Sequence, residues 1–243
     1  MRTDGLATRK RILGAAMELI ANSGFAETTN KSIAAKAGVD LASLNYHFGS
    51  RGGLYQATLG EAHRRLVSLD ELQRIATAGV PPREKLRALL EMLLARRTGP
   101  EARYALVMAR EMQSPSSHLR TLAREEIMPK LGVVLSILEE ITGIPAGDPS
   151  LLRCLVSVAA PCLMLFLGRN VTPLANVFAS THEDLTSHLY IFAIAGLDAI
   201  GAEYERRQAG SASREPRSRR PPKGPAGSRA AKTSTRTKAR RTR

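Results

Sequence analysis

The segment of residues 28–48, TTNKSIAAKAGVDLASLNYHF, constrains the fold more than any other part of the chain, because it encodes two short helices joined by a tight turn. Thr29 can cap the first helix by accepting a hydrogen bond from a backbone N–H. Gly38 can adopt the left-handed conformation that ends this helix at little cost. Asp40 is then a strong N-cap for the second helix. The pattern predicts a helix-turn-helix.

The second helix has an apolar face and a polar face. Leu44 and Phe48 lie on one side and favour burial. The other side carries small and hydrogen-bonding residues, which are Ala42, Ser43, Asn45, Tyr46 and His47. Small side chains let a helix approach a duplex closely, and Asn, Tyr, Ser and His can reach base edges or phosphate oxygens. The same pattern also fits an ordinary αα-hairpin inside a bundle, so the residues alone leave both interpretations open.

Residues 8–55 resemble the N-terminal domain of TetR-family transcriptional regulators. The likeness is carried by the first helix TRKRILGAAMELIANSGF, the TT pair, IAAKAGV, NYHF and the following GSRGGLY. The segment REMQSPSS at residues 110–117, with EEIMPKL after it, resembles a subgroup of the family that shares the NYHF recognition helix. The resemblance implies an all-α protein, in which an N-terminal three-helix helix-turn-helix domain precedes a C-terminal helical bundle for ligand binding and dimerisation.

The match to the family motif, residue by residue, implies eight DNA contacts. They are Asn30, Lys31, Ala42, Ser43, Asn45, Tyr46, His47 and Arg51. Asn45 is the best candidate for reading a base, whereas Lys31, Tyr46 and Arg51 suit phosphates.

The chain departs from the family's pattern at four positions. Asp40 stands where a Ser is common and keeps the cap, whereas Leu41 replaces a frequent Lys and removes a phosphate contact. Asn45 stands where many members carry Tyr, and Gly53 where many carry Glu. Base preference therefore cannot be copied from a relative.

We expect three parts along the chain: a DNA-binding domain over residues 1–50, a ligand-binding and dimerisation domain over 51–208, and a disordered basic tail over 209–243. The tail has no large apolar residue with which to bury surface. Residues 206–243 hold 14 of the 36 Lys and Arg residues but one of the 22 acidic residues, so the rest of the chain, with 22 basic and 21 acidic residues, is nearly neutral. The net charge of +14 thus describes the tail more than the fold.

Apolar periodicity and helix-breaking residues predict the remaining helices. Residues 1–7 are expected to be loose, and the opening helix should end at Gly24. One long helix should run from residue 50 to about residue 77 and carry motion to the DNA-binding domain. Further helices are expected at 82–97, 100–113, 116–143 with a bend at Pro129, 150–170 and 181–207.

The last two of these helices contain LVSVAAPCLMLFLG and LYIFAIAGLDAIG, which are hydrophobic around much of their circumference. A helix on the surface of a monomer would instead have one narrow apolar stripe. The resemblance implies that both helices pair with a second copy in a four-helix bundle, which predicts a homodimer. The alternative is burial within one subunit. No membrane span is expected, since the longest uncharged run, 154–168, is shorter than the roughly 18 residues that a span needs.

The resemblance also implies a small, largely apolar effector in the C-terminal bundle. Methionine and bulky apolar side chains between helices can line such a cavity, and a few polar groups can orient its ligand. The candidates are Met108, Glu111, Met112, Leu163 and Phe166, with Arg110 as a second polar group. The alternative is that these side chains only fill a core. The expected function is a DNA-binding repressor that leaves a palindromic operator when a small molecule binds.

The sequence contains no constellation typical of an enzyme. It has no phosphate-binding glycine loop and no serine nucleophile elbow, and the spacing of His182, Glu183 and His188 does not suit a zinc-protease helix. We therefore expect no catalytic residues, no metal and no cofactor. A third class, a ligand-independent architectural DNA binder, fits the basic tail, but the large apolar C-terminal region argues against it.

Cys154 and Cys162 would lie about 12 Å apart along one helix, which is too far for a disulfide. No signal peptide is visible at the N-terminus. Both observations favour the reducing cytoplasm, with the protein associated with the nucleoid.

Overall fold

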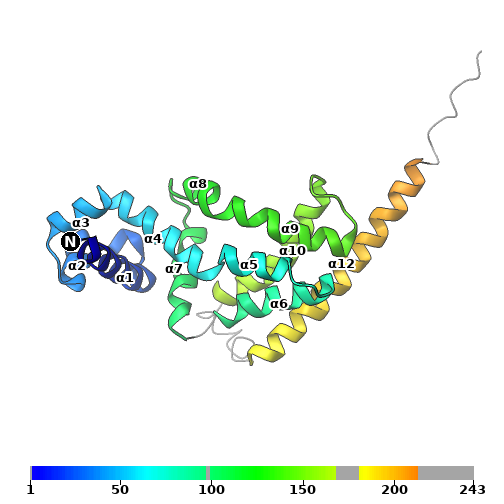
Figure 1. Ribbon diagram of the computed structural model, residues 1–243, viewed down its shortest axis with the longest axis horizontal. Helices are drawn as coiled ribbons and strands as arrows, with labels where there is room; N and C mark the ends of the chain where they lie inside the picture. Colours follow the sequence, from blue (N-terminus) through cyan, green and yellow to red (C-terminus); the bar gives the residue numbers. More distant parts are fainter. Residues whose placement is uncertain (1, 97–98, 168–180, 213–243) are drawn as a thin grey trace, which may run out of the picture.

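The computed structural model describes residues 2–96, 99–167 and 181–212, and every regular element within these ranges is helical. Figure 1 shows α1–α3 at one end of the molecule, with α4 leading from them into a bundle of the later helices. The elements are α1 (Arg2–Glu27), α2 (Asn30–Ala37), α3 (Leu41–Phe48), α4 (Arg51–Leu66), α5 (Leu69–Ala76), α6 (Pro82–Ala95), the 3-10 turn η1 (Gly99–Glu101), α7 (Ala102–Gln113), α8 (Leu119–Leu122), the π-helical turn η2 (Ala123–Ile127), α9 (Met128–Thr142), α10 (Pro149–Leu167) and α12 (His182–Ala212). The all-α class with an N-terminal helix-turn-helix is confirmed.

The two helices of the helix-turn-helix begin and end at the expected capping residues. Thr29 Oγ1 accepts a hydrogen bond from the Ser32 backbone N–H at 3.1 Å, and Ser32 Oγ accepts one from the Thr29 N–H at 3.2 Å, which completes a capping box. Gly38 ends α2 with φ 62° and ψ 44°. Asp40 Oδ1 accepts from the Ser43 N–H at 2.6 Å, and this hydrogen bonding lowers the pKa of Asp40.

Two large apolar cores hold the molecule together. The first joins α1–α4 to side chains from the bundle, namely Val107 and Met108 of α7 and Leu122 of α8. The second lies between α6, α9, α10 and α12, and it includes both cysteines, which are free and buried. Burial raises the pKa of Cys162 to about 11, so its thiol stays protonated and packs as a small apolar group.

The single helix expected over residues 50–77 is wrong, because the chain breaks between α4 and α5. Val67 is extended, with φ −134° and ψ 94°. Ser68 then caps α5, its Oγ accepting from the Glu71 N–H at 3.4 Å. Arg96, directly after α6, donates from Nη1 to the Leu66 carbonyl at 2.6 Å, which satisfies an acceptor at the end of α4. The apolar pattern continues across the break, so periodicity alone could not reveal it.

Two further expectations needed correction. Residues 2–7 belong to α1 and are not loose, although α1 does break at Gly24 (φ 83°, ψ 166°) as predicted. The helix expected over 116–143 starts at Leu119 and contains a π-helical turn, η2, directly before Pro129 in the first turn of α9. The π-helical turn is wider than an α-helical turn, and it lies where Pro129 has no backbone N–H to donate.

The two apolar C-terminal helices are present, and α12 runs past the expected end to Ala212. The tail 213–243 and the side chain of Phe166 lie outside the described residues. Within the described helices, α12 alone has the length and mean hydropathy of a membrane span (1.4 over its most apolar window), and 22% of that window is buried. Length and composition are weak support for a span, since core helices of soluble proteins pass the same test.

A polar cluster joins α4 to the start of α9. Lys130 Nζ lies 2.9 Å from His63 Nδ1 and 3.2 Å from Glu126 Oε2, and Glu126 also pairs with Arg64. Burial, and then the charge of Lys130, lower the pKa of His63 to about 4. His63 is therefore neutral at pH 7 and accepts the hydrogen bond from Lys130.

We expect the free energy of unfolding to fall as pH drops from about 6.5 to about 4, because unfolded His63 binds a proton that folded His63 does not. Between pH 7 and 4.5 this residue should account for roughly 2 kcal/mol. His63→Gln, which keeps an acceptor for Lys130, should lose that part of the pH dependence in urea unfolding. His182→Gln, at an exposed position, serves as the control. An identical pH profile for wild type and His63→Gln would contradict the assignment.

Candidate DNA-binding face and effector region

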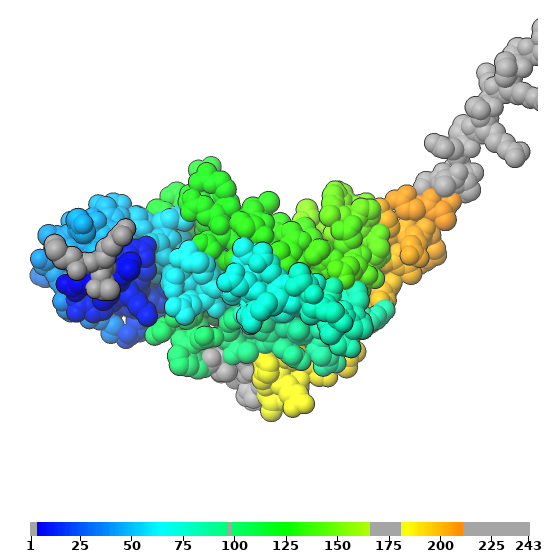
Figure 2. Space-filling model, viewed as in Figure 1, coloured from blue at the N-terminus to red at the C-terminus, as the bar shows by residue number. Residues whose placement is uncertain are grey.

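The exposed face of α3 carries the polar side chains that the sequence places there. Leu44 is fully buried against the first core, while Tyr46 is 86% exposed. Ala42 and Asn45 are exposed beside it, and Ser43 and His47 are half-exposed. This face lies at the end of the molecule formed by α1–α3, which projects from the bundle in Figure 2. Five of the eight predicted DNA contacts therefore share one accessible helix.

The first turns of α1 and α2 flank α3. Lys31 is exposed on α2, whereas Asn30 is half-buried, and its Oδ1 has no hydrogen-bond partner among the described residues. A Cβ on Gly5 of α1 would lie 3.9 Å from His47 Cε1, so the N-terminal turn of α1 lies beside the recognition helix. Sequence reasoning missed this neighbour because it left residues 1–7 without structure.

Arg51 has a structural role that differs from the expected phosphate contact. Its Nη2 donates to the carbonyl oxygens of Phe25, Ala26 and Thr28 at 2.7, 3.1 and 3.0 Å. The guanidinium also lies over the Phe25 ring, 4.5 Å from its centroid. Arg51 thus fixes the end of α1 and the residue that follows it to the start of α4.

The described residues among those predicted to line an effector cavity have different surroundings. Met108 is buried in the core shared with α1–α4, and Met112 on the same helix is 48% exposed. Glu111 is only 1% exposed, and its carboxylate is occupied by hydrogen bonds from Tyr55 and Ser116. Periodicity placed Met108, Glu111 and Met112 on α7 correctly but could not tell which neighbour each side of α7 faces. Leu163 is half-buried on α10, and the side chain of Phe166 lies outside the described residues.

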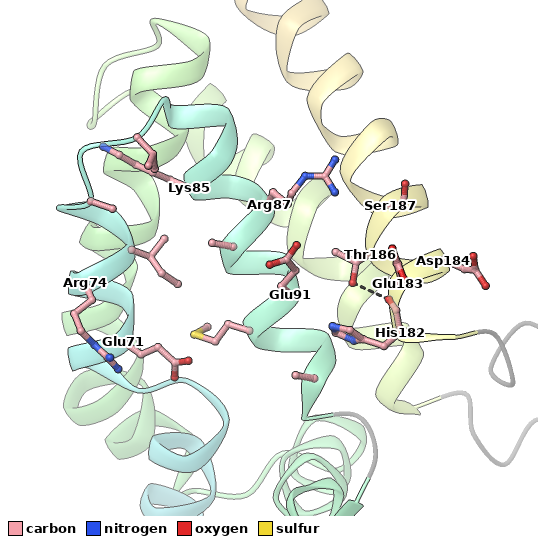
Figure 3. Close-up of a pocket in the computed structure, with 16 residues that line it drawn as sticks. Glu71, Arg74, Lys85, Arg87, Glu91, His182, Glu183, Asp184, Thr186 and Ser187 are labelled. Atoms are coloured by element: carbon pink, nitrogen blue, oxygen red, sulfur yellow. Dashed lines mark hydrogen bonds between the residues drawn. The ribbon is translucent and has the colours of Figure 1, made fainter.

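An open groove of about 1030 Å³ lies elsewhere, between α5, α6 and the start of α12. Figure 3 shows charged side chains around it, with Glu71 and Arg74 from α5, Arg87 and Glu91 from α6, and His182 from α12. Its apolar lining includes Ile75, Ala88 and Met92. The groove combines charged groups of both signs with apolar surface, which suits an amphipathic molecule. No sequence motif marks these residues, because they come from three separate helices.

Comparison with known proteins agrees with both halves of the fold. Residues 12–58 match the family described as bacterial regulatory proteins, tetR family. Residues 82–197 match the C-terminal domain of the HTH-type transcriptional dual regulator CecR. CecR of Shigella flexneri itself is 24% identical over 198 residues, which covers 76% of this chain and 87% of that protein.

Solved structures share the same architecture. A TetR-like regulator from Rhodococcus sp. RHA1 is 21% identical with a TM-score of 0.59, covering 78% of this chain and 95% of that one. The regulator FadR from Bacillus subtilis, solved with stearoyl-CoA, is 17% identical with a TM-score of 0.63, covering 77% of this chain and 98% of that one. These relatives are transcriptional regulators and not enzymes. With its helix-turn-helix, its CecR-like C-terminal domain and its all-helical architecture, this chain belongs to the TetR family of transcriptional regulators.

Proposed function

We propose that this DNA-binding regulator is a homodimeric repressor, which holds a palindromic operator through two copies of α3 and leaves it when a small molecule binds. One recognition helix reads only a few base pairs, so a two-fold dimer on two half-sites provides the specificity that a regulator needs. We assign DNA binding to residues 1–50, effector binding and dimerisation to 51–208, and an accessory role to the tail 209–243. Such a repressor works in the cytoplasm, on the nucleoid.

The main support for the proposed dimer is a solvent-exposed apolar face on α10 and α12. Phe192 and Ile191 of α12 are 65% and 62% exposed, and Val156 of α10 is 63% exposed. The exposed residues of α12 follow a helical spacing and include small ones that permit close approach of a second helix. We define this dimer face by Leu152, Val156, Met164, Ile191, Phe192, Ala195, Gly196, Ala199 and Ile200. A continuous apolar stripe of this kind favours a subunit interface.

Phe192→Glu should convert the dimer to a monomer, because it places two charges in the centre of the dimer face. The side chain is exposed in one copy, so the subunit should still fold. Specific operator affinity should fall toward the non-specific level, by about 10³-fold or more. Sedimentation and operator titration measure both effects, and Met128→Glu, an exposed apolar position on α9, is the matched control. Wild-type protein that sediments as a monomer would contradict the proposal.

The proposed reading of DNA divides the exposed face by chemistry. We assign base recognition to Asn45, because an amide can form a bidentate pair with adenine. Tyr46 and Lys31 are assigned to phosphates, and Ala42, Ser43 and His47 to close contacts along the groove. Asn30 borders this face. Arg51 supports it through the carbonyl oxygens described above and is not assigned a phosphate.

Asn45→Ala should change the preference at one base pair by roughly 1 to 3 kcal/mol. Lys31→Ala should instead weaken all duplexes about equally and reduce the salt slope by about 1. Binding to a set of single-base operator variants, at two salt concentrations, separates the two effects. A uniform loss across the set for both variants would contradict this division.

We propose the groove between α5, α6 and α12 as the effector site, replacing the cavity expected from the sequence. Arg74 and Arg87 can meet an anionic group, while Ile75, Ala88 and Met92 offer apolar surface. Glu71, Glu91, Glu183 and Asp184 also line the groove, so the lining fits an amphipathic molecule that carries charged groups. The structural neighbour FadR binds stearoyl-CoA, which makes a long-chain acyl-CoA a reasonable first probe. An effector releases DNA only if it binds the DNA-incompetent arrangement better.

Operator release by stearoyl-CoA and a panel of hydrophobic metabolites tests this site. Ala88→Trp fills the groove and should raise the concentration for half-release about tenfold or more, a loss of about 1.4 kcal/mol in binding. Met112→Ala is the control, since Met112 is exposed on α7 and does not line the groove. If the same compound concentration releases Ala88→Trp and the wild-type protein from the operator, the effector does not bind in this groove. No release by any compound would favour the alternative, a ligand-independent DNA binder.

The basic tail is proposed to add affinity without discrimination. Its Lys and Arg residues can neutralise phosphates of any duplex and release counterions. Figure 1 shows the C-terminal end of α12, after which the tail follows in the sequence, at the end of the molecule opposite α3. We therefore assign it to flanking DNA rather than to the bases that α3 reads.

A further inference from the structure

Adjacent residues of α7 reach two different helices, α1 of the DNA-binding domain and α4, which follows that domain. Arg110 Nε donates to the Ala21 carbonyl at 3.1 Å, and its Nη2 donates to the Asn22 carbonyl at 2.8 Å. These carbonyls belong to the last regular turn of α1 before Gly24 breaks it, where helix acceptors lack their usual partners and a cation is favourable. Arg110 therefore caps α1 from the other domain.

The next residue, Glu111, reaches α4. Its Oε2 accepts a hydrogen bond from the Tyr55 hydroxyl at 2.7 Å, and its Oε1 accepts from the Ser116 N–H and Oγ at 2.9 and 2.8 Å. A carboxylate that is 1% exposed depends on such donors, because burial without them is costly. Burial and the neighbouring Glu111 raise the pKa of Tyr55, which keeps its hydroxyl protonated as a donor.

The ring of Tyr55 connects α4 to α1. Phe25 stacks on it with ring centroids 3.8 Å apart and an interplanar angle of 14°. The guanidinium of Arg51 also lies over the Phe25 ring, as described above. His118 meets the Tyr55 ring edge-on at 5.6 Å and lies 3.2 Å from Gln56 Oε1 through its Nδ1. The contacts form a closed loop from α1 to α4 to α7 and back.

These contacts explain the REMQSPSS segment, which neither the DNA face nor the groove uses. Its Arg110, Glu111 and Ser116 supply the polar groups of the loop, whereas Met112 and Gln113 between them are exposed. The same helix packs on α10, one of the two helices of the proposed dimer face. α7 therefore lies between the DNA-binding domain and the dimer interface.

We infer that Arg110, Glu111, Tyr55 and Ser116 form an interdomain clamp that fixes the orientation of α3 relative to the dimer. This inference rests on the proposed dimer. Both recognition helices of a dimer must match the spacing of two half-sites, so a loosened clamp lowers specific binding. Phosphate contacts made by one subunit at a time do not need that spacing. Arg110 and Glu111 act through α1 and α4, as positioning residues, and do not touch DNA.

The operator is first selected from random-sequence DNA by the wild-type protein. The test then compares, at one salt concentration, the affinity of each variant for this operator with its affinity for a scrambled duplex. Tyr55→Phe keeps the stacked ring but removes the hydroxyl, and Arg110→Ala removes the cap of α1. Each should lower the ratio of specific to scrambled affinity about tenfold. Tyr55→Phe combined with Glu111→Leu should cost little more than Glu111→Leu alone, because Glu111→Leu already removes the acceptor of the Tyr55 hydroxyl. Arg110→Lys, which keeps charge but loses the two-carbonyl geometry, should fall between Arg110→Ala and wild type.

Arg103→Ala is the matched control, because Arg103 is exposed on the same helix and its described contacts are with its neighbour Tyr104. Its ratio should equal that of wild type. Thermal melting and sedimentation of every variant separate a loosened clamp from loss of folded or dimeric protein. A variant that loses affinity for the operator and the scrambled duplex equally would overturn the clamp. So would a variant that remains a folded dimer and keeps the wild-type ratio, and neither result would affect the proposed dimer. A monomeric wild type would instead overturn the proposed dimer.

Discussion

The apolar core that α1–α4 share with α7 is the interaction on which the rest of the structure depends. Val107 and Met108 of α7, with Leu122 of α8, are buried among the side chains of the DNA-binding helices. The helix-turn-helix therefore has no separate core of its own. Because packed interiors resist small deformations and shift between discrete arrangements, a displacement of α7 must be shared by the helices packed against it.

The local structure of the DNA-binding domain could be predicted from the sequence, because its determinants lie within a few residues of one another. The caps at Thr29 and Asp40, the turn at Gly38 and the break at Gly24 are of this kind. The break after Leu66 could not be predicted in the same way. It depends partly on Arg96, which lies directly after α6, later in the chain, and reaches the end of α4.

The functional surfaces also divide into features set by neighbouring residues, which could be predicted, and features set by distant residues, which could not. The polar face of α3 could be predicted, since burial of Leu44 forces the opposite side outward. The partners of charged side chains could not be predicted, because a guanidinium can bind a carbonyl oxygen as well as a phosphate. Arg51 and Glu111 were both assigned to ligands on their chemistry, and both are engaged by groups of the protein. The folded positions of Phe25 and Thr28 around Arg51, and of Tyr55 and Ser116 around Glu111, decide between these uses.

Apolar burial and buried polar contacts do different work at this domain boundary. Burial in the shared core is non-directional, so it holds α7 against the DNA-binding domain while allowing related packings. The hydrogen bonds of Glu111 and Arg110 are directional and are lost if either helix slides by a few tenths of a turn. Burying the Glu111 carboxylate costs desolvation free energy that the hydrogen bonds from Tyr55 and Ser116 offset, so an apolar residue of similar shape could pack there about as stably. Its presence at this boundary is therefore better explained by the single orientation that it selects than by the stability that it adds.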